Sequence, residues 1–148
     1  MVSLIIFIKL FKNGSEKSIK KTLLITGILM IVLEIYKQVI FTYQANEYQW
    51  YAFPFQFCST PMYLYVIYGL SKNKKLDSHL LSFLTTFSTF AGLAVMLYPI
   101  SVYVSTVGIN IQTMVHHGLM ASVGLALLAT KTEFNLKTLF KASTVFII

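Results

Sequence analysis

The chain has 148 residues, of which 56% are hydrophobic and only 11% are charged, and its mean hydropathy is +0.70. Soluble domains carry about 25% charged residues, and a soluble core of this length could not bury so much apolar surface. The composition therefore excludes an ordinary soluble domain and indicates one integral membrane domain over residues 1–148. The formal net charge is +7, but the lysines sit in short gaps between apolar stretches rather than on one basic face. We therefore expect no nucleic-acid partner.

The apolar stretches predict an all-α, polytopic transmembrane helix bundle of about five spans. Met1–Phe11 is apolar but too short to span, and it lacks the charged start and cleavage site of a signal peptide. Each complete span is close to the ~20 residues that a bilayer requires. A fifth begins near Leu136 and stops at Ile148 with about half that length, which leaves open that the chain is a fragment of a longer bundle. The four complete predicted spans are Thr22–Phe41, Phe53–Leu70, Leu80–Tyr98 and Asn110–Ala129.

Lysine placement predicts the orientation of these spans. Lysines precede the first span, separate the second from the third and flank the gap after the fourth, whereas the loops Thr42–Ala52 and Pro99–Ile109 contain none. Cytoplasmic loops carry an excess of Lys and Arg, so we expect a cytoplasmic N-terminus, two external loops and a multi-pass location in the cell membrane. His79 falls in a lysine-bearing loop together with Asp77, and we expect His79 to be solvated. Four aromatic residues would mark the outer interface: Tyr43, Tyr48, Trp50 and Tyr51.

Small residues recur every four positions on two of the predicted spans. Gly118, Ser122 and Ala126 do so on the fourth span, and Ser88 and Gly92 on the third. Small side chains at this spacing let helices approach closely in lipid. We interpret both stripes as packing surfaces.

Ionisable and reactive side chains fall at one depth in the outer half of the predicted membrane region. Counted at about 1.5 Å per residue from the outer ends of their spans, five of them share a layer: Glu34, Lys37, Cys58, His116 and His117. The amides of Gln56 and Gln112 lie nearby, together with Asn110, the expected N-cap of the fourth span. Ionisable residues inside a membrane are costly and usually mark a site.

Structural interpretations compete with this one. A lone cysteine in a span usually acts as a small hydrophobic residue, although Pro61 is expected to kink the helix beside Cys58. Glu34 and Lys37 are three residues apart and can neutralise each other on one helix face.

The two adjacent histidines also have more than one interpretation. His116 and His117 can serve as polar packing groups, and they diverge by about 100° around a helix, so both should not face one site. A metal centre would need three or four converging ligands, and Glu34 is the only obvious third. We therefore predict no metal and no other cofactor.

Two motifs resemble a known family of membrane proteins. The run Phe53-Pro54-Phe55-Gln56-Phe57-Cys58 and the run from Asn110 to Gly118, which contains His116 and His117, resemble the YwaF-type bacterial integral membrane proteins. The resemblance covers the first to the fourth span. Eukaryotic relatives of that family include a multispan acyltransferase acting on ether phospholipids, and a more distant similarity runs to membrane hydrolases of fatty-acid esters.

The resemblance implies a Cys nucleophile in the second span and a His partner in the fourth. These roles correspond to Cys58 and His116, with His117 as a competing choice. Gln56 stands where many relatives are expected to carry His, two residues before the Cys, and this departure weakens the transfer of activity.

The leading functional hypothesis is a Cys/His lipid acyltransferase or acyl hydrolase whose partners are membrane lipids. His116 would deprotonate Cys58, and the thiolate would attack an acyl ester. Gln56, Gln112 or Asn110 would donate hydrogen bonds to the oxyanion. Two other classes stay open: a small-molecule transporter or membrane solute-binding subunit that uses the same polar layer, and a non-catalytic packing or assembly protein.

Overall fold

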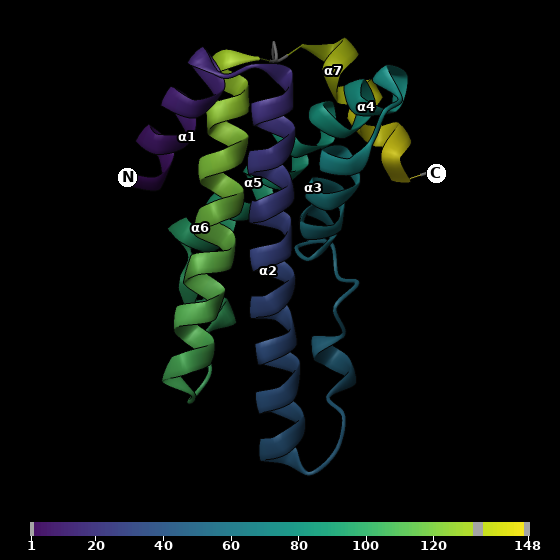
Figure 1. Ribbon diagram of the computed structural model, residues 1–148. Coiled ribbons are helices and arrows are strands. Elements are labelled where there is room, and N and C mark those ends of the chain that lie inside the picture. The colour runs from purple at the N-terminus through teal and green to yellow at the C-terminus, as the bar shows by residue number, and fades with distance from the viewer. Residues whose placement is uncertain (1, 132–134, 147–148) are drawn as a thin grey trace.

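The computed structural model describes residues 2–131 and 135–146, and the regular elements in these ranges are helices (Figure 1). Short 3-10 turns cover Trp50–Ala52, Pro99–Val102 and Thr144–Phe146. The α-helices are α1 (Val2–Asn13), α2 (Glu16–Ala45), α3 (Thr60–Leu70), α4 (Lys74–Thr85), α5 (Phe87–Leu97), α6 (Val107–Thr130) and α7 (Leu136–Ser143).

Three stretches have the length and hydropathy of membrane spans. They are α2, the α4–α5 pair over Lys74–Leu97, and α6. The prediction of an all-α membrane bundle is therefore confirmed. The predicted fifth span corresponds to α7, which begins at Leu136 as expected but ends after 8 residues and packs against α4. Ile147 and Ile148, the end of that predicted span, lie outside the described residues.

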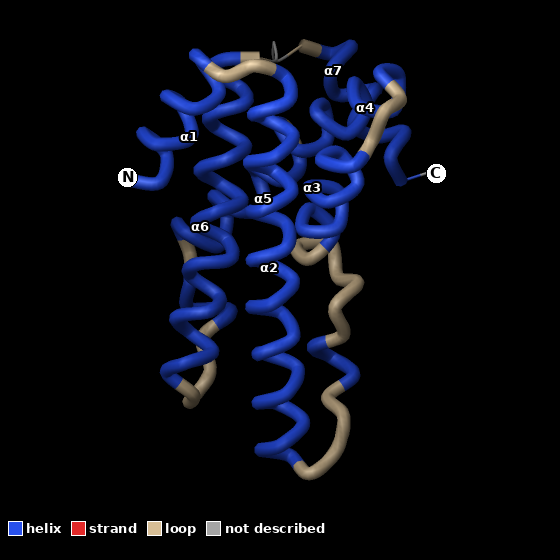
Figure 2. Tube along the Cα trace, in the orientation of Figure 1, coloured by secondary structure: helices blue, strands red, loops and turns tan. Residues whose placement is uncertain are grey.

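The predicted second span is helical only in its second half. Residues 53–59 form an irregular segment, drawn as loop in Figure 2, and α3 starts at Thr60. Pro54 helps to explain the difference, because the residue before a proline is pushed out of the helical region. Pro61 then lies in the first turn of α3, where its missing N–H costs nothing. The predicted kink at Pro61 is therefore wrong, because this proline begins a helix rather than bending one.

The predicted third span is a helix broken at Thr86. This residue has φ −97° and ψ −78°, and it separates α4 from α5. Hydroxyl groups around the break bond back to the preceding turn: Thr85 donates to the Leu81 carbonyl at 2.7 Å and Thr86 to the Ser82 carbonyl at 2.8 Å. Such back-bonding competes with the helical pattern and often bends helices, so the Ser/Thr-rich sequence explains the break.

The two stripes of small residues were predicted to be packing surfaces between helices. The structure confirms this for some of their residues. A Cβ at Gly92 on α5 would lie 2.6 Å from the Ala121 nitrogen and 2.8 Å from the His117 carbonyl oxygen of α6. Ser122 shares a hydrogen bond of 2.8 Å with Ser3, which joins α6 to α1. Gly27, which the stripes did not include, makes the equivalent close approach between α2 and α3.

The ends of the helices sort by charge. The helix ends that carry or adjoin lysines, at the junctions of α1 with α2 and of α3 with α4 and at the C-terminal end of α6, lie together at the upper end in Figure 1. We call this the lysine-rich end. The two connections without lysine, before α3 and before α6, lie at the opposite end, which we call the loop end. This is the arrangement that the predicted orientation requires.

Asp77 and His79 are not solvated loop residues. Both belong to α4, which begins at Lys74. Asp77 is buried and accepts a hydrogen bond of 2.6 Å from Lys20. His79 Nδ1 lies 2.7 Å from the Thr144 hydroxyl and thereby connects α4 to the residues after α7.

Candidate functional site

Cys58 lies in the irregular segment before α3, and it is half-buried. Its thiol donates to Gln56 Oε1 across 3.8 Å, and the Gln56 amide nitrogen donates to the Tyr51 carbonyl. Gln38 on α2 donates to the Ala52 carbonyl at 2.6 Å. The thiol is thus presented by a non-helical segment that side-chain amides hold in place, rather than by the early helical turn that the sequence predicted.

The two histidines of α6 lie beside this segment. The His116 ring lies close to the backbone of Cys58. His116 is 3% exposed and His117 is 7% exposed, and the two ring centres are 5.5 Å apart.

Each histidine has one buried ring nitrogen that meets no partner among the described residues. These atoms are His116 Nδ1 and His117 Nε2. The other nitrogen of His117, Nδ1, lies 2.8 Å from the Thr113 carbonyl oxygen and must donate to it, since a carbonyl only accepts. His117 Nε2 is therefore the basic nitrogen of the neutral ring.

Glu34 and Lys37 form a buried ion pair on α2. Lys37 Nζ lies 2.7 Å from Glu34 Oε1, and the two side chains are 14% and 5% exposed. Gln38 donates to the same Glu34 oxygen at 2.8 Å. Both charges act electrostatically on His117, and Lys37 also acts on His116. The mutual neutralisation expected from the spacing is therefore present, and it occurs next to the two imidazoles.

Two of the predicted supporting amides have other roles or surroundings. Asn110 is not the N-cap of α6, because the helix starts at Val107 with Thr106 as its N-cap residue. Its side chain instead accepts from the Val104 nitrogen at 2.9 Å and donates to the Val104 carbonyl at 2.8 Å, which fixes the preceding loop. Gln112 is buried and accepts from the Thr113 hydroxyl at 3.4 Å.

Sequence reasoning missed Tyr63 and Thr113 as parts of this region. Tyr63 on α3 donates to the Pro54 carbonyl at 3.2 Å, which ties the irregular segment to the helix that follows, and Glu34 acts on its hydroxyl. Thr113 orients His117 from one helical turn earlier, a relationship that the spacing of four residues could have indicated.

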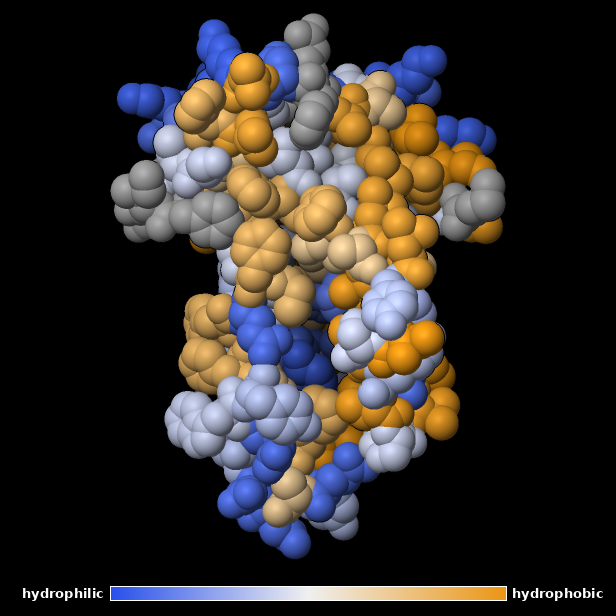
Figure 3. Space-filling model, turned by 180° about the vertical axis from the view of Figure 1, so that it is seen from behind, coloured by the Kyte–Doolittle hydropathy of each residue, from blue (hydrophilic) through white to orange (hydrophobic). Residues whose placement is uncertain are grey.

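The arrangement combines a thiol, two imidazoles and an ion pair around residues 34–38, 52–63 and 112–117. A thiol beside imidazoles can act as a nucleophile once a ring nitrogen takes its proton. Within the described residues, no group of three or more His, Cys, Asp or Glu side chains is arranged to hold a metal ion. Figure 3 shows hydrophilic side chains around a hollow in the lower, loop-end half of the rear face, between hydrophobic flanks. This is the half in which the sequence predicted the polar layer.

Comparisons with known proteins place the chain in a family of membrane proteins, as the motif resemblance predicted at that level. No curated protein and no solved structure matches the chain. A model of the TMEM164 family matches residues 1–148. With the family model matching the whole chain, the protein belongs to the TMEM164 family.

Proposed function

We propose that this protein is a membrane enzyme that transfers or hydrolyses lipid acyl groups, with Cys58 as nucleophile and His116 as general base. The observation that carries the proposal is the proximity of the His116 ring to the Cys58 backbone, together with a buried His116 nitrogen, Nδ1, that has no hydrogen-bond partner among the described residues. The resemblance of the two motifs to an acyltransferase-related family supplies the substrate class. The membrane would be the cell membrane of a bacterium.

The chemistry follows from these groups. The ring nitrogen takes the proton from the Cys58 thiol, and the thiolate forms a C–S bond to the carbonyl carbon of an acyl ester. The ester C–O bond then breaks, and the leaving alkoxide takes the proton back from the imidazolium. In the second half, a lyso-lipid hydroxyl or water loses its proton to the imidazole and attacks the thioester. The C–S bond breaks, and the thiolate regains the proton.

His117 would assist this cycle as the neighbour of the base, since its ring centre lies 5.5 Å from that of His116. For the oxyanion, Gln56 and Asn110 already use their side-chain amides on Tyr51 and Val104. We therefore assign that role to Gln112, whose amide lies one helical turn before His116.

A transporter of small molecules is the second candidate. Two interruptions of helical structure, at residues 53–59 and at Thr86, favour it, because transporters bind substrates at discontinuous helices. In that case the polar layer would bind a solute, and Glu34 and Gln112 would matter more than the thiol.

The test is labelling of Cys58 by a thiol-reactive probe with a lipid tail, in protein reconstituted into phospholipid nanodiscs. An activated thiol should react faster in the native protein than after denaturation, and His116→Ala should slow native labelling by about 10²-fold or more, the usual contribution of a general base. Cys58→Ala gives the background. Labelling that is equally fast in wild type, in His116→Ala and in denatured protein would remove the enzyme hypothesis. Turnover of a phospholipid acyl ester, followed by mass spectrometry, then separates an enzyme from a transporter with an accessible thiol.

A further inference from the structure

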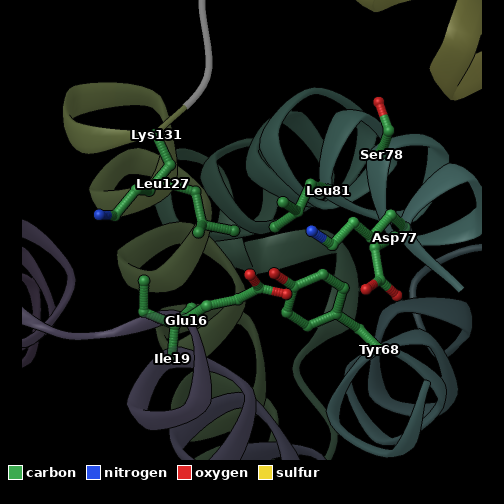
Figure 4. A pocket seen from close by; sticks show the side chains of 9 residues that line it. Glu16, Ile19, Tyr68, Asp77, Ser78, Leu81, Leu127 and Lys131 are labelled. Atoms are coloured by element: carbon green, nitrogen blue, oxygen red, sulfur yellow. The ribbon is translucent and has the colours of Figure 1, made fainter. Parts of the chain in front are cut away.

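The lysine-rich end contains a pocket of about 380 Å³, at the other end of α3 from Cys58. Its walls come from the start of α2, the end of α3, the start of α4 and the end of α6 (Figure 4). Sites for small molecules typically measure about 300–1,000 Å³. The pocket therefore has room for a ligand of the size of a lipid head group, at the level where helix ends meet the membrane surface.

Acidic groups in this pocket outnumber the cations that pair with them. Glu16 and Asp77 both line it, and both depend on one ammonium group. Lys20 lies 2.6 Å from Asp77 Oδ2 but 3.6 Å from Glu16 Oε1. Two carboxylates thus share one cation.

Lys20 also interacts with two other groups. Lys20 donates to the Ser71 carbonyl at 2.9 Å, and its ammonium lies 5.4 Å from the centre of the Tyr68 ring. Asp77 is only 6% exposed, and its second oxygen, Oδ1, has no hydrogen-bond partner among the described residues. An acceptor left in this state costs free energy, so a ligand that brings an N–H donor to Asp77 would be favoured.

The pocket also offers positive charge at its rim and an apolar floor. Lys74 and Lys131 are exposed, line the pocket and make no ion pair within the described chain. Leu81 and Leu127 supply apolar surface beside them. Figure 4 shows the Glu16 carboxylate directed towards the Tyr68 hydroxyl, across the middle of the pocket. Negative groups inside and lysines at the rim match a ligand that carries an ammonium and a phosphate.

We propose that this pocket binds a zwitterionic phospholipid with a primary ammonium head group, from the leaflet that surrounds the lysine-rich end. The ammonium lies between Glu16, Tyr68 and Asp77, and the phosphate lies against Lys74 and Lys131. A primary ammonium is required because a quaternary one has no N–H to donate to the carboxylates. The lipid, rather than a soluble phosphate ester, is the source because the floor is apolar and the lysines mark a membrane interface.

The experiment measures which lipids stay bound. The protein is reconstituted in phosphatidylcholine nanodiscs that contain equal minor fractions of phosphatidylethanolamine and phosphatidylglycerol, and retained lipids are counted by native mass spectrometry after gentle release. We expect phosphatidylethanolamine to be enriched by about tenfold over each of the other two, which corresponds to one added charge-assisted hydrogen bond. Glu16→Gln should remove most of that enrichment. Lys74→Gln and Lys131→Gln should lower retention of the three lipids alike.

Matched controls use charged residues that do not line the pocket. Glu47→Gln, in the connection before α3, and Lys72→Gln, just before α4, should leave the lipid pattern unchanged. Phosphatidylglycerol retained as well as phosphatidylethanolamine would overturn the ammonium site, and so would an enrichment that survives Glu16→Gln. Soluble phosphoethanolamine, added in excess, should not displace the lipid; displacement with no lipid preference would overturn the assignment to a lipid. This measurement of lipid binding does not depend on the acyl chemistry proposed for Cys58, so each proposal can fail without the other.

Discussion

The imidazole of His116 on α6 lies close to the backbone of Cys58, in the irregular segment that precedes α3. This proximity joins two segments that are far apart in the sequence. It also selects between the neighbouring histidines, because the second ring, His117, is bonded to the Thr113 carbonyl of its own helix. The assignment of His116 as base and His117 as its support rests on this difference.

The first prediction concerns Cys58 and His116. If they act as one unit, Cys58→Ala and His116→Ala should each lower acyl turnover to background, and the double variant should be little worse than either single one. A general base alone contributes about 10²–10⁴-fold. The measurement is release or transfer of a labelled fatty acyl chain by reconstituted protein at equal expression.

Stability and the second histidine supply the controls for this test. Cys58→Ala removes a small side chain from a half-buried position, so it should lower the free energy of unfolding by only about 1 kcal/mol. If His117→Ala abolishes turnover while His116→Ala retains it, the roles of the two histidines must be exchanged. Activity that survives Cys58→Ala excludes this nucleophile.

Membrane orientation gives the second prediction. In a Cys58→Ala background, a cysteine introduced at Glu47 should react with an impermeant thiol reagent on intact cells, whereas one at Lys74 should react only after permeabilisation. The reason is that Lys74 belongs to the lysine-rich end and Glu47 to the loop end, and positive loops stay in the cytoplasm. The reverse labelling pattern would show that the orientation of all the spans is opposite to the predicted one.

The all-α membrane class and the gathering of lysines at one end of the bundle could be predicted from the sequence, because both depend on composition over long windows. The irregular segment that contains Cys58 could not be predicted from hydropathy, because the apolar stretch continues from Phe53 to Leu70 without a break. The contacts of Gln38 with Ala52 and of Tyr63 with Pro54, together with turn hydrogen bonds such as that from the Ser59 nitrogen to the Gln56 carbonyl, show how this segment satisfies its backbone without a helix. Irregular backbone within a membrane protein requires such partners.

The polar layer was predicted from depth alone, and depth leaves helix rotation undetermined. The structure brings the His116 ring to Cys58 and the charges of Glu34 and Lys37 to the histidines. Asn110 was misassigned because α6 begins three residues earlier, at Val107. Asp77 was misassigned because its partner, Lys20, lies on a different helix, which spacing along the chain cannot show.

The third prediction concerns the ion pair of Glu34 and Lys37. Lys37→Met would leave the Glu34 carboxylate buried without its cation and should lower the free energy of unfolding by about 3–5 kcal/mol. The double variant Glu34→Gln/Lys37→Met removes both charges and should cost markedly less, which gives a positive coupling energy in a double-mutant cycle. Thermal unfolding in detergent is the readout. Lys21→Met, at an exposed lysine of the same helix, is the matched control and should change stability by no more than about 0.5 kcal/mol. If the loss in the double variant equals the sum of the losses in Glu34→Gln and in Lys37→Met, the pair contributes no coupling energy.

The fourth prediction compares two glycines from the small-residue stripes, because the structure separates them. A Cβ at Gly92 would lie 2.6 and 2.8 Å from backbone atoms of Ala121 and His117, and backbone cannot rotate away as a side chain can. A Cβ at Gly118 would meet only the Met96 side chain, at 3.8 Å or more. Gly92→Ala should therefore force α5 and α6 apart, at a cost of about 1–3 kcal/mol, and should displace His117.

Gly118→Ala is the matched control on α6. It should be neutral or slightly stabilising, by up to about 1 kcal/mol, because alanine is the better helix former. Unfolding in detergent gives the stability of both variants, and turnover gives the effect on the site. If the two substitutions cost the same, then α5 and α6 do not approach at Gly92 as closely as described. In that case the position assigned to His117, whose carbonyl oxygen makes this contact, would have to be revised with it.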